Sequence, residues 1–301
     1  MFDRLILNEE LVGCRGEVIA ARGTVLSLET VAEVARRVPA LPRRTLDETA
    51  LAADVEVPLD AAVYRHLFEG DAVRDAVRCA LRTIRLPEVL FEELLALRRA
   101  ASPIHAHGFA TAAIAVRMLL SAVGGARGVS ELAAAALLHD FGMRHVPARL
   151  LRQRERLGRD DALRVAAHPL LGAYHLASVL GAHPGVAAAQ SHHWRCGQGY
   201  PTLGRPPSRS IEVISVASAF AALTEPRPFR PGCYDARGAS DVLATEALGG
   251  HADANTVKLL VHALRGGRGD PRAIRFGRER TGHGPDVNQY VHVAAPARSP
   301  V

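Results

Sequence analysis

A nearly continuous series of helical patterns between residues 87 and 265 constrains the fold of this 301-residue chain most strongly. Apolar residues recur there at helical spacing, and no strand-like alternation separates the runs. A parallel α/β fold would need strands between its helices, so the region predicts an all-α bundle. We expect helices over 88–99, 104–123, 131–141, 161–180 (with a kink or restart at Pro169), 184–194, 209–224, 241–248 and 254–264.

The first 86 residues have a different pattern. Apolar residues interrupted by glycines predict a hairpin over 11–23, and Ser27 is a suitable N-cap for a helix over 28–38. Two further helices are expected over 60–68 and 71–86. The whole chain is therefore expected to be mainly α, with a small α+β module (1–86), a helical bundle (87–265) and a disordered tail rich in arginine, glycine and proline (266–301).

Composition restricts the class of protein. Hydrophobic residues make up 48% and charged residues 23%, as in an ordinary globular protein. The nearly uncharged stretch 213–224 is too short to span a bilayer, and acidic residues interrupt the first ten positions, unlike in a secretory leader. We therefore expect a cytoplasmic protein with no membrane partner. The four cysteines lie far apart without a Cys-x-x-Cys pair, which argues against a disulfide framework and a zinc ribbon.

The formal net charge of +6 does not indicate a nucleic-acid-binding face. From Arg265 onward there are seven arginines against three acidic residues, so most of the excess lies in the expected tail. Lys258 is the only lysine. We therefore do not expect nucleic acid as a partner.

Histidines are concentrated in the expected bundle, where nine of the fourteen lie between His105 and His193. His139 and Asp140 are adjacent at the end of an apolar helix. Such a pair alone is more often a helix-end histidine beside a solvated aspartate. An imidazole and a carboxylate can nevertheless bind one divalent ion together, and the carboxylate can bridge to a second. The bundle would bring other histidines to this pair, namely His107, His168, His192 and His193, one or two from each of three further helices.

Neutral imidazoles with one carboxylate suit iron, manganese or zinc better than calcium or magnesium. Two bridged ions can hold a hydroxide and clamp a phosphoryl group for in-line attack. The alternative for all six residues is a set of core histidines and an aspartate satisfied by hydrogen bonds. His105, His145, His175 and His183 are expected at the surface or behind the ligands, with His175 the best further candidate because it lies seven residues after His168.

Five ordered segments resemble the motifs of the HD-GYP phosphohydrolases. They are His107, His139–Pro147, His168–Ala173, His192–Pro201 and Ala222–Thr224 with Arg227–Pro231. The resemblance covers about residues 102–264, and residues 16–37 resemble the small domain that often precedes this one. It implies a helical bundle around two, sometimes three, iron or manganese ions, and many members hydrolyse cyclic di-GMP to pGpG or GMP.

The resemblance also implies roles for individual residues. The metal ligands would be His107, His139, Asp140, His168, His192 and His193, with Asp140 bridging the pair of ions that holds the catalytic hydroxide. Gly199, Tyr200 and Pro201 would shape the substrate loop. Arg227 and Arg230 would hold substrate phosphates, a role that suits the guanidinium fork.

The sequence departs from the family motifs mainly at residues expected on one side of the site. Ser218 and Ala221 stand where the family has aspartates, the first of them a metal ligand, and Met143 replaces a lysine. The loop after the histidine pair is one residue shorter. Pro103 replaces the glutamate of three-metal members. We expect one secure ion and a second that is weak or absent, unless Glu212, Glu225 or water compensates, which leaves any catalytic role at Ser218 in doubt.

Three functions remain open. The first is a metal-dependent phosphohydrolase acting on cyclic di-GMP in bacterial second-messenger signalling. The second is a catalytically impaired domain that binds the nucleotide, or a signalling-protein partner, without turnover. The third is hydrolysis of another nucleotide, which the altered loop leaves possible. Metal content and product formation separate the first two, and a panel of substrates separates the third.

Overall fold

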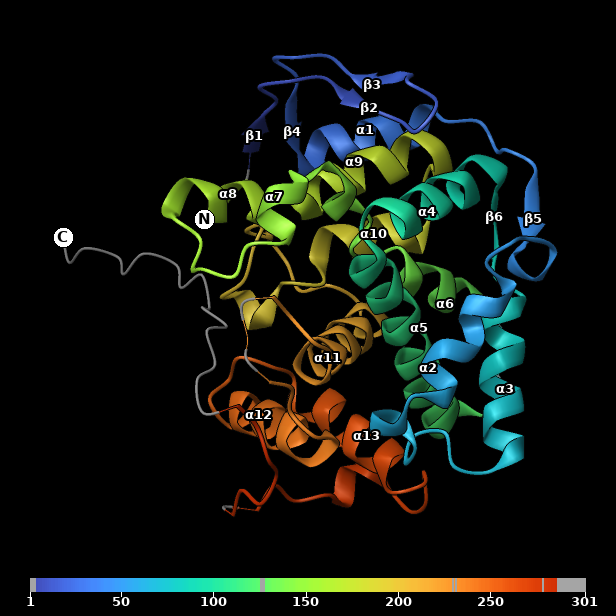
Figure 1. Cartoon of the computed structure of the whole chain (residues 1–301), viewed down its shortest axis with the longest axis vertical. Helices are drawn as coiled ribbons and strands as arrows, with labels where there is room; N and C mark the ends of the chain where they lie inside the picture. The colour runs from blue at the N-terminus through green and yellow to red at the C-terminus, as the bar shows by residue number, and fades with distance from the viewer. Residues whose placement is uncertain (1–3, 125–127, 229, 231, 278, 286–301) are drawn as a thin grey trace.

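The computed structural model describes residues 4–124, 128–228, 230, 232–277 and 279–285. The fold is mainly α, as expected, with a bundle of helices and short strands confined to the first 87 residues (Figure 1). The bundle helices are α4 (Glu88–Ala100), α5 (Ser102–Val123), α6 (Val129–Leu137), α7 (Ala148–Leu151), α8 (Arg159–Ala166), α9 (His168–Leu180), α10 (Pro184–Ser191), α11 (Arg209–Thr224), α12 (Ala236–Leu248) and α13 (Ala254–Leu264).

Helix α5 is the central helix of the bundle. It packs against α4, α6, α11 and α13, and its side chains from Phe109 to Met118 are buried. A helix that is apolar all round belongs in a core or a membrane. Among the described residues, α5 is the one helix long and apolar enough to cross a bilayer, but 67% of its most apolar window is buried inside this fold, as in the core helix of a soluble domain.

Near the clustered histidines, two helices end earlier than expected, and the expected restart at Pro169 is confirmed. Helix α6 ends at Leu137, and the chain continues as a turn and a 3₁₀ helix over Phe141–His145. The expected helix 161–180 is two helices, because Pro169 has no N–H to donate and therefore occupies the first turn of α9. Helix α10 ends at Ser191. His139, His168 and His192 thus all lie at helix ends, whereas α11 has the expected bounds.

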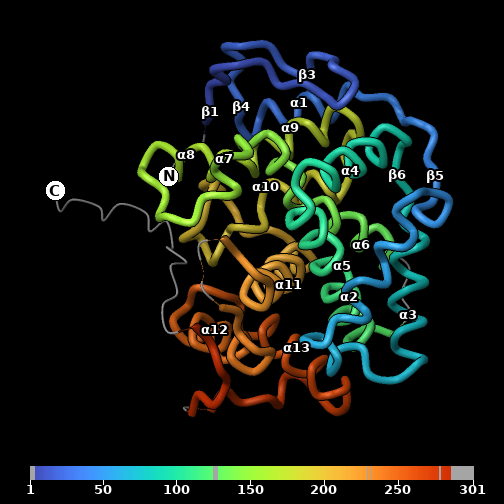
Figure 2. The backbone as a smooth tube through the Cα atoms, viewed as in Figure 1, coloured from blue at the N-terminus to red at the C-terminus, as the bar shows by residue number. Residues whose placement is uncertain are grey.

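The first part of the chain forms two hairpins and a helix. β1 (Arg4–Ile6) pairs with β4 (Val25–Ser27), and β2 (Leu11–Val12) pairs with β3 (Val18–Ala20), both antiparallel. Helix α1 (Leu28–Arg37) follows, with Ser27 as its N-cap, as expected. Leu7, Leu11, Ala20 and Leu26 pack on the start of α9. This part therefore covers α9 at one end of the molecule, opposite α12 and α13 (Figure 2).

Residues 43–87 belong to the same core as the bundle. β5 (Arg43–Thr45) pairs with β6 (Arg85–Pro87), and between them lie α2 (Glu56–Asp60) and α3 (Asp71–Arg82). The prediction of a helix over 60–68 is wrong, since only a 3₁₀ turn at 62–64 forms there. The helix expected over 71–86 ends at Arg82, because the chain enters β6 at Arg85. Apolar side chains of this segment and of α5 form one continuous cluster.

The described residues between 266 and 285 differ from the expected disorder. Backbone N–H groups of Thr281 and Gly282 donate to Asp241 Oδ2 on α12, and the His283 N–H donates to Asp235. Acidic side chains at the start of α12 thus provide acceptors that fix this segment. Residues 286–301 of the expected tail lie outside the described residues.

Candidate metal centre

Two glycines bring the chain after α6 against the start of α9. A Cβ on Gly142 would lie 1.9 Å from the carbonyl oxygen of His168, and one on Gly172 would lie 2.7 Å from the Gly142 nitrogen. No side chain fits in either place. The close backbone contact therefore depends on both glycines, and it holds Asp140 beside the first turn of α9.

The Asp140 carboxylate lies at the centre of four imidazoles. Its Oδ1 is 3.2 Å from Nε2 of His168 and 3.1 Å from Nε2 of His192. Its Oδ2 is 3.7 Å from Nε2 of both His107 and His139. The two oxygens of one carboxylate thus face two different pairs of histidines.

The other nitrogens of these rings fix their tautomers. Nδ1 of His139 donates to the Ala136 carbonyl at 2.7 Å, and Nδ1 of His168 donates to the Val165 carbonyl at 2.8 Å. Nδ1 of His192 likewise lies 3.0 Å from the Ala188 carbonyl. Because a carbonyl can only accept, each neutral ring carries its proton on Nδ1 and directs the lone pair of Nε2 towards Asp140.

Such an arrangement fits a cation. Nε2 of His168 and His192 are 3.2 Å apart, and Asp140 Oδ1 is buried with no hydrogen-bond donor among the described residues. Lone pairs that face one another and a carboxylate repel unless a positive ion lies between them. Two groups of potential ligand atoms lie within 4.8 Å of one another and share the aspartate, namely His107, His139 and Asp140, and Asp140, His168, His192 and His193.

Burial and neighbouring charges shift the pKa values of His139, His193 and Asp140 towards their ligand forms. Burial lowers the pKa of His139 to about 3 and, together with His192 and His168, holds the pKa of His193 well below its ordinary value. Burial opposes ionisation of Asp140, but the positive charge that the imidazoles, His139 first, carry when protonated holds the pKa of this carboxyl well below its ordinary value. Neutral imidazoles and an ionised carboxylate are the donors that borderline transition-metal ions prefer.

Ser218 completes the group around His107 and His139, but without a charge. Its buried Oγ on α11 lies 3.2 Å from Nε2 of His107 and 3.0 Å from Nε2 of His139. One hydroxyl proton can serve only one of these nitrogens. The group therefore has one carboxylate and a neutral fourth atom, while the group around His168 and His192 has the same carboxylate and three imidazoles.

Glu225 was considered from the sequence as a substitute for the missing carboxylate ligand, but the structure gives it another contact. Its Oε2 lies 2.8 Å from Nδ1 of His107, on the side of the ring away from Asp140, and accepts a hydrogen bond from Arg227 at 3.2 Å. Glu225 therefore orients His107 instead of replacing the missing ligand. The seven-residue spacing from Ser218, two helical turns, was the available clue. Glu212, the other acid considered, belongs to neither ligand group.

The predicted substrate loop lies beside His193. The Tyr200 ring stacks on His193 with centroids 4.6 Å apart and 23° between the planes. A Cβ on Gly199 would lie 1.4 Å from the His193 carbonyl oxygen, so the loop closes tightly, and Pro201 follows as a buried residue. An ion pair of 2.8 Å between Arg195 and Glu246 ties the loop to α12.

The two arginines expected to hold phosphate differ. Arg227 is partly exposed and lies against Glu225 and His107, near the ligand groups. Arg230 is buried instead, and its Nε and one terminal nitrogen donate to the carbonyls of Ala222, Leu223, Glu225 and Gly232. Arg230 thus donates to carbonyl groups that the end of α11 leaves without partners. These donors are not available for the phosphate contact that was expected of Arg230.

Four other histidines of the bundle, His105, His145, His175 and His183, have partners of their own, and all but His145 are buried and not at the surface. Nε2 of His105 lies 2.9 Å from Asp54, and Nε2 of His145 lies 3.0 Å from Nδ1 of His175. His183 is the N-cap of α10, accepting from the Gly185 N–H at 3.0 Å. His175 faces buried Glu93 on α4. None belongs to the two ligand groups found among the described residues.

The chain is similar to several known proteins. The chain is 29% identical over 128 residues to the 3'3'-cGAMP-specific phosphodiesterase 1 of Vibrio cholerae, which is 42% of this chain but only 30% of the length of that relative. Among solved structures, the HD domain of the phosphodiesterase PgpH from L. monocytogenes, in complex with cyclic-di-AMP, has a TM-score of 0.43 and 16% identity over 58% of this chain and 94% of that one. Bd1817, an HDG"Y"P protein from Bdellovibrio bacteriovorus, has a TM-score of 0.46 and 16% identity over 72% of this chain and 69% of that one.

A family model described as HD domain matches residues 90–256, more than half of the chain. The match extends from α4 to α13 and includes every residue of both ligand groups. The chain therefore belongs to the HD domain family.

Proposed function

We propose that this protein is a metal-dependent phosphodiesterase of the HD-GYP type that opens cyclic dinucleotides, with cyclic di-GMP the first candidate substrate and pGpG or GMP the products. The observation that carries the proposal is the single carboxylate of Asp140 between two sets of imidazole Nε2 atoms. The name of the Vibrio cholerae relative supports a cyclic dinucleotide as the substrate class.

In this proposal His107, His139, Asp140, His168, His192 and His193 hold one or two divalent ions, iron or manganese. When bound, such ions supply a hydroxide at neutral pH and neutralise charge on the phosphate. The tautomers set by backbone carbonyls keep the ligand rings in place without reorganisation.

The chain's other residues would bind and orient the substrate. Arg227 is partly exposed beside His107 and can place its free N–H groups on a phosphate oxygen. Tyr200, held on His193, bounds the opposite side of the centre and offers an aromatic face to a base. Buried His139 and His192 exclude water from the interior side.

A receptor without turnover is the second candidate, and Ser218 favours it. A neutral hydroxyl between His107 and His139 is a poorer ligand than a carboxylate. With only one ion bound, the bridged nucleophile is missing, and the domain would bind a cyclic dinucleotide or a signalling partner without hydrolysing it.

Anaerobic incubation with Fe(II) or Mn(II), followed by chromatography, tests the proposal. Cyclic di-GMP, 3'3'-cGAMP and cyclic di-AMP are compared, with a His139→Ala/Asp140→Ala double variant as the control. Linear product from the intact chain alone supports the enzyme, and the panel identifies the preferred substrate. If all three nucleotides survive but one binds, the receptor function holds; if none binds, both fail.

We also propose that the protein acts in the cytoplasm. All four cysteines are free in the structure, which fits a reducing compartment.

A further inference from the structure

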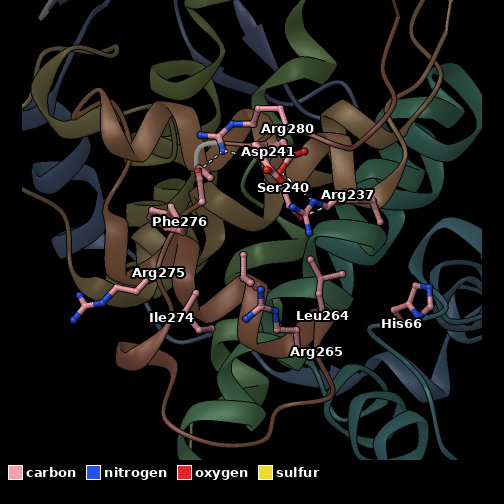
Figure 3. A pocket seen from close by; sticks show the side chains of 15 residues that line it. His66, Arg237, Ser240, Asp241, Leu264, Arg265, Ile274, Arg275, Phe276 and Arg280 are labelled. Carbon is pink, nitrogen blue, oxygen red and sulfur yellow. Dashed lines mark hydrogen bonds and ion pairs between the residues drawn. The ribbon is translucent and has the colours of Figure 1, made fainter.

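A pocket lies away from the metal centre, where α12 and α13 meet residues 274–277, 279 and 280 (Figure 3). Its volume is about 210 Å³. None of its lining residues is a candidate metal ligand or lies in the loop around Tyr200. Helix α11, which carries Ser218, packs against both α5 and α12, so the pocket and the centre are separate sites on connected helices.

The floor of the pocket is apolar. Ala244 from α12, Val261 and Leu264 from α13, and Ile274 and Phe276 from the following segment line it. All five are buried or half-buried. Such a floor favours a flat, uncharged part of a ligand, and Phe276 provides an aromatic face on which a base can stack.

The charged groups around this floor are mainly arginines. Four of them, Arg237, Arg265, Arg275 and Arg280, line the pocket together with two acids. Figure 3 shows Arg237 and Arg280 near Asp241 and Arg265 directed into the space below them, whereas Arg275 points away from the other lining side chains.

Most of the arginine donors remain available to a ligand, while one of the acids is fully used. Asp241 accepts from Arg237 Nε on one oxygen and from two backbone N–H groups on the other. Arg280 donates to Thr245 Oγ1 and the Gly277 carbonyl. Within the described part of the chain, the Arg265 side chain has no hydrogen bond or ion pair, and both terminal nitrogens of Arg237 have none.

We propose that this pocket binds a nucleoside monophosphate, or a larger nucleotide through one such unit. Guanidinium groups bind phosphate by paired, charge-assisted hydrogen bonds, and the apolar floor takes the base. Arg265 and Arg237 hold the phosphate, and Phe276 contacts the base. The remaining acid, Glu279, lies on the exposed segment and disfavours ligands of higher negative charge.

Calorimetric titration of the full-length protein with GMP, guanosine and inorganic phosphate tests this site. Arg237→Ala/Arg265→Ala is expected to weaken GMP binding about tenfold or more, as the loss of charged hydrogen bonds predicts. Phe276→Ala weakens binding of guanosine and GMP but not of phosphate. Arg272→Ala is the matched control, because Arg272 is an exposed arginine just before Ile274 that does not line the pocket, and it leaves all three affinities unchanged.

The His139→Ala/Asp140→Ala variant separates this site from the proposed function. The pocket predicts that GMP binding survives in that variant, whatever the hydrolysis assay gives. GMP binding that depends on His139 and Asp140 and not on Arg237 and Arg265 would overturn the pocket and leave the phosphodiesterase intact. No GMP binding to any form would likewise overturn it.

Discussion

The two carboxylate oxygens of Asp140 face two pairs of imidazoles, His107 with His139 and His168 with His192. Beside the first pair, the further potential ligand atom is the neutral Oγ of Ser218. This asymmetry predicts unequal affinity for two ions. Both positions share the negative charge of Asp140, and the position around His107 and His139 adds only the neutral hydroxyl of Ser218. The other position has the same carboxylate and one more imidazole ligand.

Ser218→Asp is therefore expected to increase the metal content of the purified protein towards two ions per chain. The added carboxylate would lie between Nε2 of His107 and His139. Elemental analysis after dialysis measures this, with Ser218→Ala as the comparison. An unchanged ratio of metal to protein in a folded Ser218→Asp variant would show that the missing charge is not what weakens the second position.

Glu225→Gln keeps the shape of the hydrogen bond to His107 but removes the charge. A carboxylate behind a ligand histidine raises its basicity, so we expect about 10- to 100-fold weaker binding of one ion with the other unaffected. Competitive titration with a metal indicator measures both affinities. Glu212→Gln on the same helix, outside both ligand groups, is the control, and equal effects of the two variants would contradict the assigned role.

At the residue scale, the sequence predicted which side chains gather at the centre where those residues belong to a recognisable motif. All six candidate ligands come together, because each lies on an apolar helix or at its end. It failed at Arg230, because a motif does not reveal that helix-end carbonyls use the guanidinium donors. It considered Glu225 only as a replacement ligand and missed its contact with His107, because that ring is more than a hundred residues away in the chain.

At the scale of elements, helix ends position the centre. α6 and α10 stop just before their histidines, and α9 starts on one. The sequence predicted these helices but extended two of them through the site. Periodicity continues past the point where the chain turns, and the turns depend on tertiary contacts such as that between Gly142 and Gly172.

Gly142→Ala tests this contact. Its Cβ would meet the His168 carbonyl at 1.9 Å, so the start of α9 must shift. We expect a loss of about 3 kcal/mol in the free energy of unfolding, together with lower metal content. Gly158→Ala, where nothing lies within 4 Å of the added Cβ, is the control for chemical denaturation. Equal stability of both variants would refute the tight packing.

The N-cap of α10 predicts a pH dependence. Burial, assisted by Arg43, lowers the pKa of His183 to about 4, and its Nδ1 accepts from the Gly185 N–H. The unfolded chain takes up this proton below about pH 6.5, whereas the folded protein resists it down to about pH 4. Stability should therefore fall as pH decreases through this window.

Urea denaturation at pH 7.5 and pH 5 measures the effect. His183 accounts for a difference of about 1–2 kcal/mol between the two pH values. His183→Asn keeps a capping oxygen and removes the titrating ring, so the difference should shrink by that amount. An unchanged difference would show that His183 does not titrate in this way.

At the scale of the molecule, one core joins most of the chain. The sequence separated 1–86 from the bundle by the pattern of apolar residues, glycines and prolines. Apolar side chains from Leu46 onward nevertheless share a core with α5 and α6, whereas Leu7, Leu11, Ala20 and Leu26 form a smaller cluster with the start of α9. The pattern of apolar residues in the sequence shows which side chains are buried, but it does not show against which other segment they pack. Whether these regions form separate domains remains a prediction.

A titration of the metal-free protein with Mn(II), under nitrogen and with an indicator dye, tests the central claim most directly. The account predicts one tightly bound ion per chain and a second, weaker one. His168→Ala removes the tight ion, and His107→Ala removes only the weak one. Two ions of equal affinity, or loss of the tight ion in His107→Ala with retention in His168→Ala, would contradict it.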